Sequence, residues 1–425
     1  MLTWSEFYNQ FSIQLNEQQQ SAVQSVNGPV LLLAVPGSGK TTVLVTRLGY
    51  MIFCRGIAPE KILTVTYTVA ATKDMSERFA SRFGQELADR LEFRTINGIC
   101  ARVIQYYGRK TARTAFSLLT DEKRISAILS AIYQKTERVY PTQGDLKNVR
   151  TLITYIKNRM LNEKEIEALD ETAEIQISEI YKEYCKHLRE NQLMDYDDQM
   201  VYAYNMLRKI PWLLEYFQDQ YPYICVDEAQ DTSKIQHAII ALLATESGNL
   251  FMVGDEDQSI YGFRAAYPEA LLSFEKNHKG AKVLLMEENF RSNAKIVEAA
   301  DKFIQKNTLR HEKHMKPARE AGTDIREAYE LGIAGVKYAI EGNTGFIPVL
   351  KRISDAPYRS VIEYADLKSI ANVEKKVPLE WINKAHNNVT DNMLEYVKPL
   401  INGEIMLPYK NGLPDHLWQD TKYMD

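Results

Sequence analysis

Short apolar runs rich in branched residues recur along the front part of the chain. Each run ends in small or polar residues, and none alternates between apolar and polar positions as a half-exposed strand would. Such runs are typical of strands that are buried on both faces of a parallel sheet. The pattern therefore predicts strands at Val30–Ala34, Ile62–Thr66, Ile224–Asp227, Leu250–Gly254 and Val283–Met286.

Amphipathic stretches long enough to be crossover helices separate these runs, which favours a layered α/β domain. Residues 107–191 differ, because they are rich in Lys, Glu, Leu, Ile and Tyr and nearly free of Gly and Pro. We predict a helical insertion there, between two strands of the sheet. Most of its tyrosines are expected to pack between helices; the set is Tyr106, Tyr133, Tyr140, Tyr155 and Tyr181.

The strand–helix rhythm stops after Pro317, where Gly and Pro become frequent. A D-x-x-E capping pattern at Asp324 begins a predicted helix that ends at Gly342. An apolar strand is expected at Phe346–Leu350. The predicted apolar face of this helix consists of Ile325, Ala328, Gly332, Val336 and Ala339.

The predicted architecture is thus an α/β domain with a parallel sheet, a helical insertion and a small α+β tail. Its parts are residues 1–106 with 192–318, residues 107–191, and residues 319–425. A single core rarely exceeds ~250–300 residues, so a chain of 425 residues is expected to hold at least two domains.

Composition narrows the function classes. A net charge of −4 argues against a protein that coats nucleic acid indiscriminately, although it leaves room for a local basic groove. The four cysteines form no C-x-x-C pair, so no zinc or iron–sulfur site is indicated. The N-terminus lacks the features of a signal peptide, and no apolar run approaches the ~20 residues that span a bilayer. We therefore expect a cytoplasmic protein.

A phosphate-binding loop is indicated at residues 34–41 (AVPGSGKT), between a strand and a helix. Gly37 and Gly39 let backbone N–H groups point at phosphate oxygens, and the helix N-terminus adds partial positive charge. Lys40 is expected to reach the β- and γ-phosphates of a nucleotide, and the Thr41 hydroxyl to bind Mg²⁺.

Two acids follow the strand that ends near Val226, within the sequence DEAQD at residues 227–231. Ligands of open α/β sheets bind at the carboxyl ends of strands, so both carboxylates are expected at such a site. We expect Asp227 to hold Mg²⁺ and Glu228 to orient and deprotonate the attacking water. An acidic strand end alone is often a solvated cap; together with the phosphate loop it favours hydrolysis.

These segments and several others resemble superfamily 1 DNA helicases of the UvrD/Rep/PcrA type over about residues 15–307. The matching segments are 15–23 (LNEQQQSAV), 34–41, 62–68 (ILTVTYT), 93–97 (FRTIN), 194–198 (MDYDD), 227–231, 253–264 (VGDEDQSIYGFR) and 288–292 (ENFRS). The resemblance implies a RecA-like fold and an ATP-dependent 3′-to-5′ helicase that acts in DNA repair. Its cofactors would be ATP and Mg²⁺, and its partner single-stranded or 3′-tailed duplex DNA.

The resemblance also assigns roles to residues. Gln19 would read the adenine, while Gln258 and Arg291 would act at the γ-phosphate. The nucleotide-binding set would be Gln19, Ala34, Gly37, Ser38, Gly39, Lys40, Thr41 and Thr42. The DNA-binding set would be Tyr67, Thr68, Thr95, Asn97, Tyr261 and Phe263, of which Tyr261 and Phe263 would stack on bases.

The chain departs from the family pattern at a few positions. Val35 and Thr42 replace a Gly and an Arg in and after the phosphate loop, and Asn97 replaces a His. Val69-Ala70 replaces an Asn-Lys pair, which removes a phosphate contact to DNA. Phe263 replaces a Trp but keeps a stacking face. None of these changes affects the groups expected at the phosphates.

After Arg291 the sequence carries no match to the later helicase motifs, which in the family belong to a second RecA-like domain with an arginine finger. Residues 319–417 instead resemble the C-terminal end of phosphofructokinases, especially the pyrophosphate-dependent type. The segments that carry this resemblance are 322–324 (GTD) onward, 341–345 (EGNTG), 349–352 (VLKR), 371–378 (ANVEKKVP) and 399–404 (PLINGE). His311 and His314, near the junction, are expected on a solvated helix face.

Three hypotheses follow. The first is a DNA-stimulated ATPase descended from 3′-to-5′ translocases. The second is a module that binds ATP and single-stranded DNA without turnover, because loss of an arginine finger costs ~10³–10⁵ in rate in related chemistry; these 425 residues are expected to behave closer to this one. The third is a phosphofructokinase-related enzyme. Gene fusion and assembly error both remain open as origins of the join.

Overall fold

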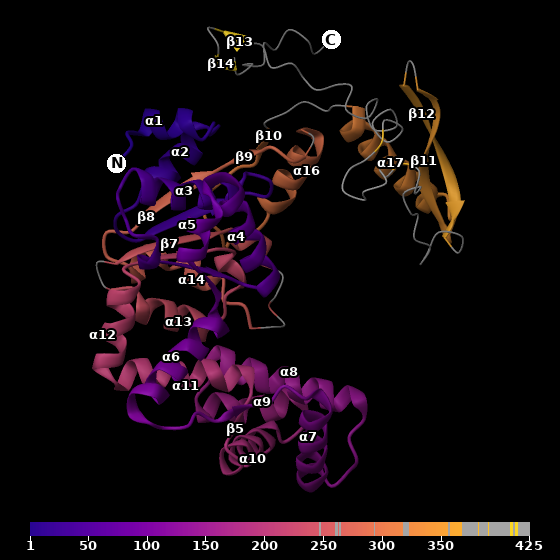
Figure 1. Cartoon of the computed structure of the whole chain (residues 1–425). Helices are drawn as coiled ribbons and strands as arrows, with labels where there is room; N and C mark the ends of the chain where they lie inside the picture. The colour runs from indigo at the N-terminus through magenta and orange to yellow at the C-terminus, as the bar shows by residue number, and fades with distance from the viewer. Residues whose placement is uncertain are drawn as a thin grey trace. The chain divides into compact units, whose positions relative to one another are not determined.

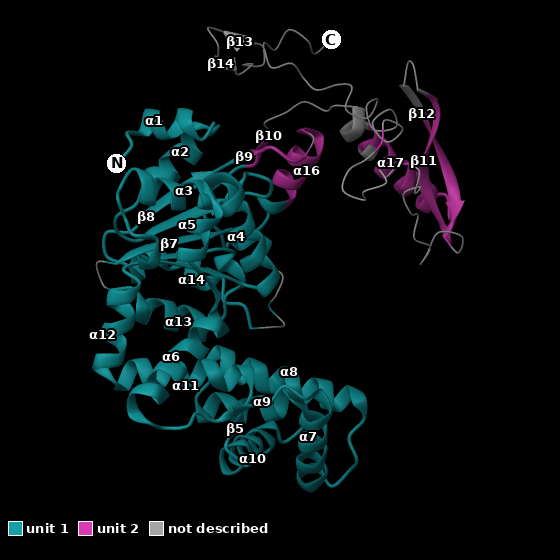
Figure 2. Ribbon diagram, in the orientation of Figure 1, with its two compact units in different colours: residues 1–287, 304–314 teal, residues 288–303, 315–425 magenta. Residues whose placement is uncertain are grey.

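The computed structural model describes residues 1–245, 248–259, 262, 265–292, 294–317, 323–355, 358–367, 381, 390, 409–410 and 413–414. The chain divides into two compact units, coloured in Figure 2. Unit 1 comprises Met1–Glu287 and Ile304–His314, and unit 2 comprises Glu288–Phe303 and Met315–Asp425. Tyr261 and Phe263, and the segments 371–378 and 399–404, lie outside the described residues.

Unit 1 is built on a six-stranded sheet with the order β3-β2-β6-β7-β1-β8, and every neighbouring pair is parallel. Its strands are β1 (Val30–Ala34), β2 (Ile62–Thr66), β3 (Glu92–Thr95), β6 (Tyr223–Val226), β7 (Asn249–Gly254) and β8 (Lys282–Met286). The strands predicted from apolar runs are confirmed to within one residue at either end. β3 was not predicted, because this edge strand is partly exposed and therefore lacks an apolar run.

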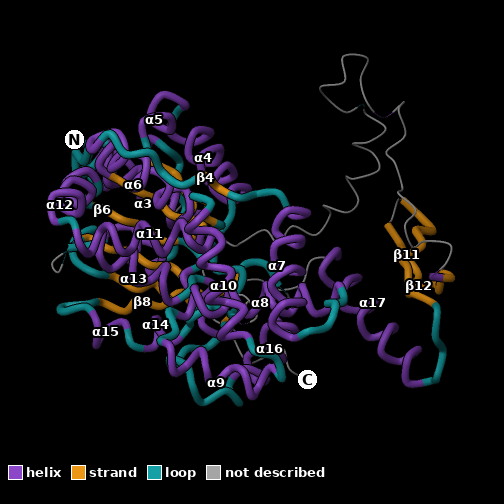
Figure 3. The backbone as a smooth tube through the Cα atoms, turned by 90° about the horizontal axis from the view of Figure 1, so that it is seen from below, coloured by secondary structure: helices purple, strands orange, loops and turns teal. Residues whose placement is uncertain are grey.

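Helices cover both faces of this sheet (Figures 1 and 3). Side chains alternate along β1, so that Leu31 and Leu33 join one core while Val30 and Leu32 join the other. One core is completed by α6 (Ile96–Thr111), α11 (Tyr196–Lys209), α12 (Pro211–Gln220) and α13 (Lys234–Leu243). The other is completed by α1 (Trp4–Gln10), α2 (Glu17–Gln24), α3 (Lys40–Phe53), α4 (Val69–Phe83) and α5 (Gln85–Arg90). This confirms the RecA-like α/β class.

Short elements complete the sheet layer. They are the short helices α14 (Glu269–Leu272) and α15 (Phe274–Asn277) and the 3₁₀ turns Pro59–Lys61, Ala229–Asp231 and Glu256–Gln258. The turn Ala229–Asp231 follows β6 and belongs to the acidic segment 227–231. The turn Glu256–Gln258 follows β7 and carries Gln258.

The segment between β3 and β6 is helical, as predicted. It contains α7 (Glu122–Glu137), α8 (Gln143–Arg159), α9 (Glu163–Ala173) and α10 (Ile177–Glu190), with a parallel pair of short strands, β4 (Ser117–Leu118) and β5 (Leu193–Met194). These helices share a separate hydrophobic core that includes Leu129, Val149 and Ile180. Tyr133 belongs to that core, but Tyr140 is 80% exposed, so the packing role predicted for the tyrosines fails at this position.

A buried lysine ties the helical insertion to the sheet layer. Lys157 on α8 is 3% exposed, and its Nζ lies 2.7 Å from carboxylate oxygens of both Asp195 and Asp198. Burial alone would lower the pKa of Lys157, but the two carboxylates outweigh it and raise the pKa. Asp195 also caps α11, accepting a hydrogen bond from the backbone N–H of Asp198 at 2.7 Å. The ion pair therefore joins α8 to the start of α11.

Unit 2 contains a parallel pair, β9 (Glu288–Asn289) with β10 (Lys316–Pro317), and the helix α16 (Ala294–Ile304). Its tail combines α17 (Thr323–Ile340) with the antiparallel strands β11 (Phe346–Asp355) and β12 (Tyr358–Asp366), followed by the short pair β13 (Tyr409–Lys410) and β14 (Leu413–Pro414). This matches the predicted α+β tail. Gly342, at φ +82°, follows the helix as expected of a C-cap glycine.

The apolar face predicted for α17 is wrong at Gly332, Val336 and Ala339, which are exposed, while the side chains of Ile325 and Ala328 lie outside the described part of the structure. Val336 is 61% exposed, whereas Ala334 is buried. Tyr338 decides the orientation, because its ring stacks on Tyr364 of β12 with the centroids 3.9 Å apart. Ile340, the last residue of α17, is 80% exposed.

Gly49 of α3 provides a test of the packing between α3 and α4. A Cβ on Gly49 would lie 2.7 Å from Cε1 of Phe83, whose ring is held by Phe7 and Phe11. Gly49→Ala should therefore lower the free energy of unfolding by about 1–2 kcal/mol, although alanine favours helices by about 0.5–1 kcal/mol. Urea denaturation measures the change.

The matched control is Gly144→Ala in the first turn of α8. A Cβ there meets nothing closer than Oγ1 of Thr142 at 3.5 Å. This variant should be neutral or slightly more stable, so equal losses from both substitutions would contradict the packing argument.

Candidate nucleotide site and adjoining groove

The phosphate loop lies between β1 and α3, in the arrangement predicted from its sequence. Gly37 and Gly39 adopt φ values of +71° and +86°, which only glycine takes without strain, and Gly39 is the N-cap of α3. The loop is held in place when the backbone N–H of Val35 donates to the carbonyl of Met286 at 3.0 Å. Ser38 is buried, and its hydroxyl finds no partner among the described residues.

Gln19 contacts this loop directly. Its Nε2 donates to the carbonyl oxygen of Ser38 at 2.9 Å, and its own backbone is fixed by a reciprocal capping box with Asn16. Arg47 of α3 holds the other end of α2. Its buried guanidinium donates to the carbonyls of Ala22 at 3.0 Å and Ser25 at 2.6 Å. Helix α2 is therefore bonded to the phosphate loop near its start and to α3 at its end.

The acidic end of β6 meets the phosphate loop across β7. Nζ of Lys40 lies 2.7 Å from Oε2 of Glu228, although β7 separates β1 from β6 in the sheet. Asp227 is 9% exposed and continues the β6 ladder by donating its N–H to the carbonyl of Val65 at 2.9 Å. Glu228 has a φ of +48°, a left-handed conformation that costs a non-glycine residue about 1 kcal/mol or more.

Gln230 and Gln258 connect these groups through Asp255. The Nε2 of Gln230 donates to Glu228 at 2.8 Å, while its Oε1 accepts from the backbone N–H of Asp255 at 3.1 Å. Nε2 of Gln258 donates to Oδ2 of Asp255 at 2.6 Å and lies 3.4 Å from the carbonyl oxygen of Ala34. The ends of β1, β6 and β7 thus share one hydrogen-bond network.

Burial shifts the titration of the acids. The pKa of Asp227 is raised to about 6, first by burial and then by the charge of Glu228, while Lys40 opposes the shift. The pKa of Asp231 is also raised to about 6, by burial and then by Glu228. A cation placed beside Asp227 would stabilise the ionised carboxylate and so lower its pKa again.

The residues fit a nucleotide with Mg²⁺. The oxygen ligands that Mg²⁺ prefers would come from Thr41, at the start of α3, and from Asp227. The unpartnered hydroxyl of Ser38 and the two left-handed glycines form a loop suited to phosphate oxygens. Thr42, the last of the predicted nucleotide-binding residues, is exposed in the first turn of α3.

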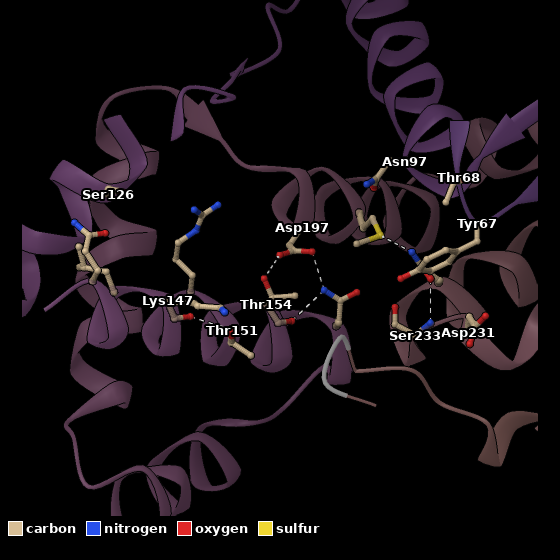
Figure 4. Close-up of a pocket in the computed structure, with 16 residues that line it drawn as sticks. Tyr67, Thr68, Asn97, Ser126, Lys147, Thr151, Thr154, Asp197, Asp231 and Ser233 are labelled. Atoms are coloured by element: carbon tan, nitrogen blue, oxygen red, sulfur yellow. Dashed lines mark hydrogen bonds between the residues drawn. The ribbon is translucent and has the colours of Figure 1, made fainter. Parts of the chain in front are cut away.

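A cavity of about 630 Å³ lies between the sheet layer and the helical insertion (Figure 4). Tyr67, Thr68 and Asn97, predicted as DNA-binding residues, line one side. Lys147 of α8 lines the opposite side, and Asp197 lies between the two sides. The remaining lining residues are Ser126, Gln143, Leu146, Arg150, Thr151, Thr154, Asn158, Met200, Asp231, Ser233 and Gln236.

The cavity mixes both charge signs. Asp197 is fixed by hydrogen bonds from Oγ1 of Thr154 at 2.9 Å and Nδ2 of Asn158 at 2.7 Å, and burial raises its pKa. Lys147 and Arg150 supply cations along the α8 wall. Neither was predicted from the sequence, because charged residues on a long helix resemble an ordinary solvated face. Their spacing of three residues places them on one side of α8.

Other predicted residues have visible structural roles. The hydroxyls of Thr68 and Thr95 cap α4 and α6, accepting from the backbone N–H groups of Ala71 at 3.0 Å and Gly98 at 3.1 Å. Thr95 does not line the cavity. Arg291 belongs to unit 2, where its N–H donates to Oδ1 of Asn289 at 2.8 Å, so its role at the γ-phosphate stays a prediction.

The helix predicted at His311 and His314 is wrong, although His314 is exposed as predicted. Both residues lie in an irregular segment after α16. The backbone N–H of His311 donates to Oε1 of Glu256 at 2.7 Å, and that of His314 donates to Glu287 at 3.0 Å. Pairing with acids, rather than helical periodicity, sets their positions.

Comparison with known proteins identifies the family. Residues 15–279 match the model for the UvrD/REP helicase N-terminal domain. The chain belongs to the UvrD/REP helicase family. This UvrD/REP member is 35% identical over 319 residues to the ATP-dependent DNA helicase PcrA of Bacillus subtilis, an alignment that covers 75% of the chain and 43% of that relative.

A second relative of this UvrD/REP member is PcrA of Staphylococcus aureus strain Mu50, with 32% identity over 314 residues, 73% of the chain and 42% of the relative. The chain therefore spans less than half the length of these relatives. A solved pyrophosphate-dependent phosphofructokinase from Nitrosospira multiformis shares 28% identity over 40% of this chain and 37% of its own. Its TM-score of 0.20 carries no argument about the fold.

No helix among the described residues of the UvrD/REP chain combines the length and the apolar character needed to cross a membrane.

The raised pKa of Asp227 makes a testable prediction. Because its pKa is about 6 in the folded chain, against an ordinary 3.8, the unfolded chain releases this proton first. Ionisation of Asp227 therefore lowers stability as the pH rises from about 4 to about 6, and the full cost remains above that range. Asp227→Asn should stabilise the nucleotide-free protein at pH 8 by roughly 2–3 kcal/mol, with little gain at pH 4.

Thermal melting at several pH values, without nucleotide or magnesium, measures this difference. Asp219→Asn, an exposed position on α12, serves as the control and should change stability equally at both pH values. A constant offset between Asp227→Asn and the unmodified chain across this range would contradict the assignment.

Proposed function

We propose that unit 1 binds ATP with Mg²⁺ and single-stranded DNA as the front motor half of a 3′-to-5′ DNA helicase. The observation that carries the proposal is the contact of Lys40 with Glu228 at 2.7 Å, beside the buried Asp227. It brings a phosphate-binding cation and two carboxylates to one end of the sheet. The name of the relatives, ATP-dependent DNA helicase PcrA, agrees with this chemistry.

On the nucleotide side, the loop amides and Lys40 bind phosphate, and Gln19 reads the adenine. Thr41 and Asp227 would hold the Mg²⁺ ion, which when bound would neutralise developing charge on the phosphates. Glu228 exchanges its contact with Lys40 for the attacking water and accepts a proton from it. The water oxygen bonds to the γ-phosphorus while the bond from that phosphorus to the β–γ bridging oxygen breaks, so that ADP leaves. Gln230 keeps that carboxylate oriented, because its Nε2 already donates to Oε2 of Glu228 at 2.8 Å.

On the DNA side, the cavity between the sheet layer and α8 supplies the groove. Tyr67 offers a stacking face, and Asn97 offers an amide whose Oδ1 lacks a donor among the described residues. Lys147 offers a cation for phosphates on the opposite wall, whereas Arg150 already pairs with Glu122, its Nη2 lying 3.1 Å from Oε1, and would have to exchange that partner for a phosphate. Such a combination binds single strands with little sequence preference. Tyr261 and Phe263 are proposed to add stacking faces by family resemblance.

We further propose that the chain of 425 residues turns ATP over slowly. Arg291 is the proposed γ-phosphate ligand of the front half, but the later family motifs that carry the arginine finger have no counterpart in these residues. Such a loss costs about 10³–10⁵ in rate in related phosphoryl transfer.

A cytoplasmic location is proposed as well.

The C-terminal segment 319–425 is proposed to descend from the C-terminal part of a phosphofructokinase and to carry no phosphoryl-transfer site. Its described part includes a helix packed on a hairpin through Tyr338 and Tyr364. The domain division at residues 1–106 with 192–318, 107–191 and 319–425 is retained as part of this proposal.

Steady-state ATP hydrolysis tests the enzyme assignment. With Mg²⁺ and single-stranded oligonucleotide, the unmodified chain should show slow, DNA-stimulated turnover, and Lys40→Ala should show none. Nucleotide binding is measured alongside by calorimetry. Equal background rates for the two proteins would reject hydrolysis, and tight ATP binding without turnover would instead establish the binding-module alternative.

The salt dependence of DNA binding tests the groove. Lys147→Ala should weaken binding of a single-stranded oligonucleotide and reduce the slope of log K against log salt by about 0.7, the value for one lost phosphate contact. The control is Lys164→Ala on α9, an exposed lysine outside the cavity. If both variants change the slope equally, binding is not localised in this groove.

A further inference from the structure

The loop after β7 carries consecutive carboxylates that are largely withdrawn from water. The side chains of Asp255, Glu256 and Asp257 are 1%, 3% and 8% exposed. Burying a carboxylate costs several kcal/mol unless a cation compensates it. The compensating groups come from residues 310–313, more than fifty positions later in the chain, so this pairing is a property of the tertiary structure.

Lys313 is the centre of the cluster. Its Nζ, on a side chain that is 1% exposed, lies 3.0 Å from Oδ1 of Asp255, 2.8 Å from Oε1 of Glu256 and 3.0 Å from Oδ2 of Asp257. Burial alone would lower the pKa of Lys313, but the surrounding carboxylates raise it. Arg310 pairs with Asp257 through Nη2 at 2.8 Å.

Asp255 is the member of the cluster that faces the nucleotide site. Its Oδ1 contacts Lys313 and accepts from the N–H of Asp257 at 3.1 Å, while its Oδ2 accepts from Nε2 of Gln258 at 2.6 Å. Its backbone N–H donates to Gln230, whose other end donates to Glu228. Lys313 is therefore separated from Gln258 by a single carboxyl group.

We propose that Lys313 is a positioning residue that fixes Asp255 and thereby aims Gln258 at the γ-phosphate. The inference rests on the proposed function as an ATP-binding motor half. Residues 304–314 belong to unit 1, but both of their flanking stretches, ending at Phe303 and beginning at Met315, belong to unit 2. Lys313 therefore lies in a segment of unit 1 whose two ends are both covalently continuous with unit 2, and it reaches Gln258 through the carboxylate of Asp255.

Arg310 offers a matched control. It is buried in the same cluster, with 6% of its side chain exposed, and it forms its ion pair with Asp257. Its further hydrogen bonds go to Gln305 and to the carbonyl of Lys313, and neither they nor the ion pair involve Asp255. If the cluster has only a structural role, loss of Lys313 and loss of Arg310 should change the ATP-over-ADP preference by similar amounts. If Lys313 positions Gln258, only the loss of Lys313 should reduce that preference.

The experiment compares the unmodified chain with Lys313→Met, Lys313→Arg and Arg310→Met. Hydrogen–deuterium exchange of the nucleotide-free proteins reports on the amides of residues 255–259. Calorimetric titration with ATP and with ADP, each with Mg²⁺, gives the preference for the γ-phosphate. Lys313→Met should speed exchange in this loop and reduce the ATP-over-ADP preference by roughly tenfold or more. Arg310→Met should keep that preference, and Lys313→Arg should restore part of it.

Unchanged exchange and preference in Lys313→Met, or equal losses in Arg310→Met, would overturn the positioning role while leaving the proposed function intact. If the unmodified chain binds neither nucleotide, the proposed function and the sensing role of Gln258 both fail, and the exchange data alone decide whether Lys313 orders the loop. Should Lys313→Met not fold, Lys313→Met with Glu256→Gln removes one charge of each sign. The double variant gives the same test, because the ion pairs of the Glu256 side chain are with Lys313 and His311 rather than with Asp255 or Gln258.

Discussion

The candidate nucleotide site depends on one contact, the ion pair of Lys40 with Glu228. Its two residues follow strands that are not neighbours, so the pair forms only when β7 lies between β1 and β6 with all three strands parallel and in register. The carboxyl ends of the strands then meet at one edge.

Several energetically unfavourable features, which packing of the core does not require, lie close to this ion pair. Asp227 is a carboxylate largely removed from water, Glu228 adopts a left-handed backbone conformation, and the Ser38 hydroxyl lacks a partner among the described residues. A nucleotide with its cation would compensate several of these costs at once. The surrounding helices over-determine the site, as Arg47 does by fixing α2 against α3.

Polar contacts distant in sequence connect the site to the rest of unit 1. Lys157 joins the helical insertion to Asp195 and Asp198, and so sets the second wall of the cavity. Lys313 joins the returning segment to the loop that bears Gln258. Both lysines are nearly inaccessible, and both are compensated by carboxylates that the sequence places in short acidic runs. The acidic runs 195–198 and 255–257 therefore bind lysines that are distant in the sequence, in addition to any role at the nucleotide.

The sequence by itself determined the elements and the chemistry of the phosphate site. Buried parallel strands leave an unbroken apolar run, and a phosphate loop needs glycines and a lysine at fixed spacing, so both are visible locally. Features that depend on contacts between residues distant in the sequence were decided only by the tertiary structure. β3 is an edge strand with no apolar run, Lys147 and Arg150 line a cavity only because α8 packs opposite Asn97, and Tyr364 selects which face α17 buries. Lys313 shows the same limit, since no local pattern reveals that carboxylates more than fifty residues away enclose it.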